Sequence, residues 1–167
     1  MIKISQSLFF LSLGISGQLA LAQPATYENS VLSIPQGAAL VDGVPTYYND
    51  IQLVSDIEGN FTVTAAEKRS LVAVDTVIAN VAQPLPLQVS VTVTGNKSIP
   101  CVELQAPAIF RNGTVFTIAL AETVLGPAES CIAVLDPFET AIVLDVEGLP
   151  SDDYSVNVNG IEAEFSL

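Results

Sequence analysis

The stretch that decides the fold is YSVNVNGIEAEFSL, Tyr154 to Leu167, where two alternating runs meet at Asn159-Gly160. Asn-Gly is the strongest short signal for a two-residue hairpin loop, because both residues accept a positive φ. The cross-strand pairs that this loop predicts are all apolar: Val158 with Ile161, Val156 with Ala163, and Tyr154 with Phe165. We therefore expect a closing β-hairpin with one buried face.

The region 87–167 shows about seven short alternating runs separated by turn residues. We place strands at residues 87–95, 102–110, 114–120, 130–135, 140–146, 154–158 and 161–167. A three-residue loop with Gly113 in the left-handed conformation would pair Phe110 with Thr114 and Ala108 with Phe116. Seven short strands at this spacing predict an all-β protein, built on an immunoglobulin-like antiparallel β-sandwich.

The region 23–67 differs in character and predicts a small β-meander of three strands, at residues 30–35, 45–56 and 60–66. Such a sheet needs a partner for its apolar face, either the sandwich or another copy. Residues 68–86 are expected to link or bridge the two modules. The run at 71–81 fits a further strand or a short helix, and two prolines follow it.

Residues 1–22 have the features of a signal peptide. Lys3 supplies a positive start, the apolar run Leu8–Ser16 is too short to cross a bilayer, and Ala20-Leu21-Ala22 offers a small-x-small cleavage site. We expect cleavage before Gln23 and a periplasmic or secreted protein. We expect no transmembrane segment in the mature chain.

The sequence contains two cysteines, Cys101 and Cys131, and no histidine. In an exported chain an even pair of cysteines predicts a disulfide. Closing a loop of about 30 residues should stabilise the fold by about 3–4 kcal/mol. A zinc site is excluded, because two isolated cysteines without histidine cannot supply four ligands.

The charge balance is strongly acidic. Without Lys3, four basic residues remain to set against 18 acidic ones, which is a formal charge of −14. Binding to nucleic acid is excluded, because phosphates need Lys and Arg, and anionic lipid surfaces are disfavoured. The partner is expected to be another exported protein or a second copy.

Enzymatic activity is not expected. Without histidine, neither a Ser-His-Asp nor a Cys-His site is possible. Paired carboxylates could cleave glycosides, but the sequence has no Trp for a sugar platform and suggests no cleft. A carboxylate-dependent hydrolase is therefore the lowest-ranked function.

Calcium is the one ion that the sequence makes worth testing; no other cofactor is expected. Asp56, Glu58 and Asn60 alternate, and Glu67 is twelfth counting from Asp56, as in an EF-hand loop. Phe61 stands where that loop needs Gly, so a hairpin turn explains the pattern better. A second acidic group surrounds the turn at Pro150: Glu147, Asp152 and Asp153.

The C-terminal segment resembles the closing strands of bacterial exported immunoglobulin-like or fibronectin-like domains, a family of unknown function. Many of these end in a pattern like Gly-Leu-Pro-x-Gly-x-Tyr-x-Val-x-Val-Asn-Gly. The matching residues are Gly148, Leu149, Pro150, Tyr154, Val156, Val158, Asn159 and Gly160. Asp152 stands where the pattern usually has Gly, so we expect a different turn there. The resemblance implies a fold and a compartment but no activity.

The function that these observations favour is an exported, non-enzymatic β-sandwich protein. It would bind another protein or assemble in the cell envelope or extracellular matrix, for instance by strand addition at a free sheet edge. The alternative is an inhibitor of an exported protease, acting through the loop Gly126–Ser130 beside the predicted disulfide.

Overall fold

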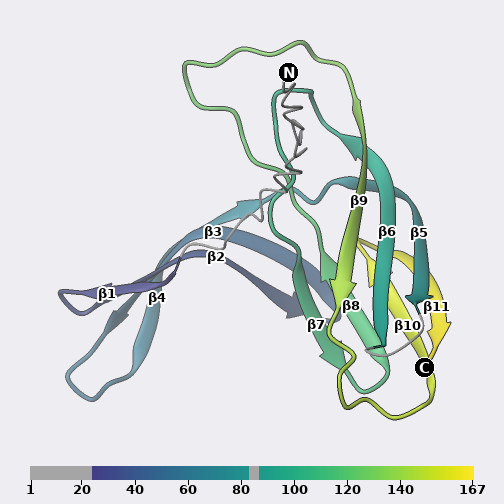
Figure 1. The fold of residues 1–167 in the computed structure, drawn as a ribbon. Coiled ribbons are helices and arrows are strands. Elements are labelled where there is room, and N and C mark those ends of the chain that lie inside the picture. Colours follow the sequence, from purple (N-terminus) through teal and green to yellow (C-terminus); the bar gives the residue numbers. More distant parts are fainter. Residues whose placement is uncertain (1–23, 83–86) are drawn as a thin grey trace, which may run out of the picture.

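The computed structural model describes residues 24–82 and 87–167, and these form two β-sheet parts (Figure 1). A four-stranded sheet, here called the arm (residues 24–69), projects from one side of a β-sandwich built by the following residues. The predicted signal peptide (1–22) lies outside the described residues, as do residues 83–86 of the predicted linker. The described residues contain no helix that is long and apolar enough to cross a lipid bilayer.

The arm is the predicted meander with one short strand added. Its strands follow chain order in the sheet: β1 (Thr26–Glu28), β2 (Val31–Val41), β3 (Val44–Ser55) and β4 (Phe61–Arg69). The β2–β3 turn is Asp42-Gly43, whose φ angles of 52° and 78° suit a two-residue hairpin loop. The register shifts between β3 and β4 in the region from Asn49 to Leu53, so the sheet is bulged there.

The sandwich consists of two facing sheets (Figure 1). One sheet has the order β5 (Ala73–Ala82), β6 (Gln88–Lys97) and β9 (Asp136–Leu144). The other has the order β11 (Ile161–Ser166), β10 (Asp153–Val158), β8 (Val115–Ala119) and β7 (Ala108–Asn112). The all-β sandwich prediction is confirmed, with one difference: β8 and β10 run parallel.

The core lies between the inward faces of the two sheets and follows the alternation in the sequence. The fully buried aliphatic side chains are Val89, Val91, Val93, Ile118, Leu120, Val156 and Val158. Each of them contributes about 1.5–3 kcal/mol by leaving water. Most of the core therefore comes from β6, β8 and β10, which are interior strands of their sheets.

The closing hairpin has the predicted register. Val158 lies opposite Ile161, and Tyr154 lies opposite Phe165. The two aromatic rings stack with their centroids 5.5 Å apart, and both side chains are buried. Asn159 adopts a φ of 49°, as the two-residue loop requires.

The predicted β7–β8 register is wrong. Asn112 pairs with Val115, and Arg111 pairs with Phe116, so the loop contains two residues and Phe110 does not face Thr114. The strand also begins late, only at Ala108, because Pro107 has no N–H to donate. The predicted strand at 102–110 is thus shortened to Ala108–Asn112.

The predicted strand at 130–135 is also wrong, since these residues form no strand. Cys131 is tied to Cys101, and the Val134 N–H donates to the Ile132 carbonyl at 3.0 Å, which folds the segment into a tight turn. Regular pairing begins where Asp136 meets Lys97. The strand predicted at 140–146 therefore starts earlier, as β9.

The segment at 71–81, for which a strand or a helix was open, contains strand β5. It pairs antiparallel with β6 and packs beside β11, so it closes one side of the sandwich. The sandwich therefore draws its seventh strand from the region that was predicted to link the modules.

Candidate interaction surfaces

One surface of the arm carries apolar side chains that stay exposed to solvent. Leu32 lies opposite Leu53, and Leu53 lies opposite Val63, so the three share a face across β2, β3 and β4. Tyr27 and Phe61 pack edge to face nearby, with ring centroids 6.3 Å apart. Tyr27, Phe61 and Val63 are 57%, 50% and 58% exposed. We call these five residues the arm face; Leu32 and Leu53 are half-buried in it, and the other three are exposed.

The arm tip is an ordered turn. The Asp56 carboxylate accepts hydrogen bonds from the N–H groups of Glu58 and Asn60, both at 2.9 Å, and from the Asn60 side-chain amide at 3.0 Å. These bonds favour the charged form and hold the pKa of Asp56 below its usual range. Ile57, between the acidic residues, is fully exposed.

The calcium candidates Asp56, Glu58 and Asn60 therefore meet in a turn that hydrogen bonds already hold. The other acidic group lies elsewhere: Asp152 accepts from the N–H of Asp153, and Asp153 accepts from the Ser166 hydroxyl. Among residues 24–82 and 87–167, no three His, Cys, Asp or Glu side chains converge as a metal site would require.

The hydrogen bonds to Asp56 predict how its contribution to stability depends on pH. The pKa of Asp56 is lowered by folding, so its contribution to stability is complete above the aspartate pKa of the unfolded chain. That contribution is lost as the pH falls through the lower, folded pKa. In an NMR titration, Asp56 should titrate below an ordinary aspartate, and Asn60→Ala should move it back toward the ordinary value. An unchanged midpoint in the variant would contradict this assignment.

A joint of buried side chains fixes the arm to the sandwich. The Tyr47 hydroxyl of β3 donates to the carbonyl of Ala106 at 2.8 Å, and burial raises the pKa of Tyr47. Tyr47 packs with Ala119 and Ala121 in a small core of its own. Beside it, the buried Gln105 amide donates to the Glu122 carbonyl at 2.9 Å. The arm therefore projects in a defined direction.

We expect Tyr47→Phe to lower the free energy of unfolding by about 1 kcal/mol, because the half-buried Ala106 carbonyl loses its donor. Urea denaturation measures the change. Tyr48→Phe is the matched control, since its hydroxyl makes no hydrogen bond to any residue that the structure describes. Equal changes in the two variants would show that the Tyr47 bond does not hold the joint.

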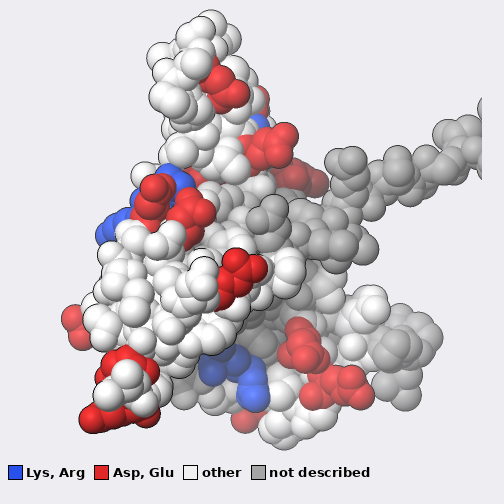
Figure 2. Space-filling model, turned by 90° about the vertical axis from the view of Figure 1, so that its left-hand side faces the viewer, with Lys and Arg blue, Asp and Glu red and all other residues white. Residues whose placement is uncertain are grey.

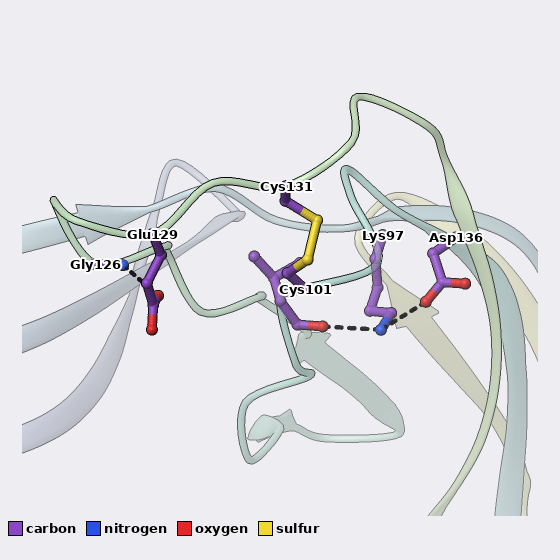
Figure 3. Close-up of a disulfide and its surroundings, with 7 residues drawn as sticks. Lys97, Cys101, Gly126, Glu129, Cys131 and Asp136 are labelled. Carbon is purple, nitrogen blue, oxygen red and sulfur yellow. Dashed lines mark hydrogen bonds and ion pairs between the residues drawn. A yellow bond between two sulfur atoms is a disulfide. The ribbon is translucent and has the colours of Figure 1, made fainter.

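The two predicted cysteines form the expected disulfide, with Cα atoms 6.1 Å apart (Figure 3). Nearby, the Lys97 ammonium contacts Asp136 at 2.8 Å and donates to the Val102 carbonyl at 2.8 Å. The turn at Gly126 is held by its N–H, which donates to the Glu129 carboxylate at 2.8 Å. The disulfide and the ion pair pin both ends of the segment 132–135.

That pinned segment carries a second exposed apolar group. Ile132, Val134 and Leu135 are 68%, 56% and 65% exposed. Their alternation predicted a strand, but the structure places no neighbouring strand beside them. They form a small apolar projection next to the disulfide.

The acidic charge is dispersed. Seen from the side of the arm, acidic side chains stand in small groups separated by uncharged surface, with few basic ones (Figure 2). The sequence contains five Lys and Arg residues and 18 Asp and Glu residues. This face offers no broad basic surface for phosphate groups.

Neither apolar surface was located from the sequence. Alternation in 30–35 and 60–66 predicted which residues share a face, but not that the sandwich would leave that face uncovered. The uncharged run Phe61–Ala66 was the available signal, since edge strands usually carry charges.

Residues 91–167 match a family model described as the ORF11 beta-sandwich domain. The match begins within β6 and excludes the arm and β5. Its description agrees with the observed fold and states no activity. No curated protein and no solved structure matches the chain.

Proposed function

We propose that this protein is an exported, non-enzymatic binding module that engages another protein through its arm, in the cell envelope or the extracellular matrix. The sandwich serves as the stable base, because its core is complete without the arm. The arm is the element that presents unsatisfied apolar surface. The partner would be another exported protein or a second copy.

The arm face is the observation that carries this proposal. Its residues lie on a sheet that, within the described residues, packs against the sandwich at the joint around Tyr47. Burying the three most exposed of them, Tyr27, Phe61 and Val63, would return a few kcal/mol on binding. A rigid joint adds to this gain, because little conformational freedom remains to be lost.

Export and the lack of catalysis have separate support. A disulfide is stable in oxidising compartments outside the cytoplasm, and residues 1–22 have the pattern of a signal peptide. The sequence has no histidine, so the commonest catalytic base is missing.

Site-specific photocrosslinking in cells of the source organism tests the binding role. A photoreactive phenylalanine analogue at position 63 should crosslink to a partner. The same group at Val143 should not, although Val143 is 65% exposed on the outer face of β9. Equal crosslinking from both positions, or none from position 63, would refute a binding role for the arm.

The alternative, protease inhibition, is favoured by one observation. The loop Gly126–Ser130 is exposed and lies beside the disulfide, with the apolar segment 132–135 following it. Constrained, exposed loops can occupy a protease cleft with little loss of entropy. Stoichiometric inhibition of a subtilisin-like or chymotrypsin-like protease, abolished by Leu135→Asp, would support this function over arm-mediated binding.

A further inference from the structure

We propose that the arm binds a second copy of this chain, by antiparallel pairing of the two β4 edges about a two-fold axis near Val63. This inference rests on the proposed binding role of the arm and names its partner. Strand β4 lies at the edge of the arm sheet, with β3 on one side only. Its free edge can therefore accept another strand.

The composition of β4 permits such pairing. The outer residues Phe61–Ala66 carry no charge, no Pro and no Gly, and all of them are exposed. Natural edge strands are usually protected by charged residues, and this one has them only at its inner end. The register shift between Val63 and Ala65 bends the edge, so it limits continuous pairing to short runs on either side.

The charges at the two ends of β4 select an identical strand. The turn before it contains Asp56 and Glu58, and its inner end contains Lys68-Arg69. If Val63 lies opposite Val63 of a second copy, the turn that carries Glu58 lies at the end of the second β4 that carries Lys68, and this contact occurs twice by symmetry. Lys68 is exposed and forms no ion pair within the described part of the chain, so it is available.

The shape of the tip agrees with the same register. Ile57 is fully exposed in an ordered turn and would lie near the Lys68-Arg69 end of β4 in the second copy. At that end of β4 the surface has a shallow cavity lined by Val44, Pro45, Lys68 and Leu71, among others. An apolar tip flanked by acids matches a cavity that has apolar walls and a lysine.

A charge-reversal cycle tests the pairing. The purified chain should sediment as a dimer that dissociates on dilution. Glu58→Lys and Lys68→Glu should each raise the dissociation constant at least about tenfold, because each creates like-charge contacts twice. The double variant should recover most of the loss, which a merely structural effect would not produce. No recovery would overturn the antiparallel register.

The axis residue provides an independent test. Val63→Lys places two like charges side by side at the axis, and we expect a monomer. Val143→Lys, on an equally exposed position of β9, should stay dimeric. A wild-type chain that is monomeric at every concentration, or a dimer that survives Val63→Lys, would overturn this inference.

The photocrosslinking experiment separates the two proposals. A crosslinked product from position 63 with twice the mass of the chain supports self-pairing. A product with a different protein, together with a monomeric purified chain, refutes self-pairing while the binding role of the arm stands.

Discussion

Removing the Cys101–Cys131 disulfide is expected to lower the free energy of unfolding by about 3–4 kcal/mol. The bond joins residues 30 positions apart, and β7 and β8 lie within the loop that it closes. In the unfolded chain the crosslink removes conformations that the reduced chain can adopt. The folded state gains little from the bond itself, because the strands of the loop are already paired.

The measurement is urea denaturation of Cys101→Ser/Cys131→Ser beside the oxidised parent. The midpoint should fall, and the denaturant dependence should rise, since an unfolded chain without the crosslink exposes more surface. Full reduction of the parent should reproduce the variant. A loss below about 1 kcal/mol would show that the entropy of the unfolded chain is not what this bond controls.

Asn159→Ala should be nearly as damaging, with a loss of about 3 kcal/mol. The Asn159 side chain accepts from the Leu120 N–H at 3.0 Å and donates to the carbonyls of Leu120 and Val72, at 2.7 and 3.0 Å. Its loss leaves the Leu120 N–H and the Val72 carbonyl without this partner, while the Leu120 carbonyl keeps its hydrogen bond from the Val72 N–H at 3.0 Å. Alanine is also strained at the φ of 49° that Asn159 adopts.

Two further variants separate the hydrogen-bond contribution to this loss from the contribution of backbone strain. Asn159→Gly removes the same hydrogen bonds but accepts the backbone conformation, so it should recover about 1 kcal/mol of the alanine loss. Asn157→Ala is the control, because its side chain bonds Glu162 at 3.0 Å and the Gly160 N–H at 2.9 Å, both within the hairpin itself. If Asn159→Ala lowered the free energy of unfolding no more than Asn157→Ala does, the hydrogen bonds from Asn159 to Leu120 and Val72 would not contribute to stability.

The closing hairpin shows what could be predicted from the sequence. The pattern from Tyr154 to Phe165 contains both the turn signal and the alternation, so the register and the buried face follow from local rules. The same rules failed at Gly113, where matching apolar pairs favoured a three-residue loop but the chain forms a two-residue one. There the register depends on β10, which pairs with β8 and is distant in sequence.

The candidate surfaces were less predictable for the same reason. Alternation at 130–135 predicted a strand, but the disulfide and the β9 register leave these apolar residues in a tight turn with no strand beside them. The tip at Asp56 was correctly favoured as a turn over an EF-hand, because Phe61 occupies the position that needs Gly. Whether the arm face is exposed depends on where Tyr47 packs against the sandwich, which is a contact between residues distant in sequence.

The side chain of Asn159 bonds to a carbonyl 87 residues earlier in the chain, at Val72. Strand β10 also lies between β8 and β11, so this sheet cannot form completely until β10 has been synthesised. A ribosome-bound chain that ends before this hairpin would therefore expose β6 and β8 to water and to chaperones. The arm, whose strands pair only with their neighbours along the chain, has no such delay, so its uncharged edge is presented before the sandwich can fold.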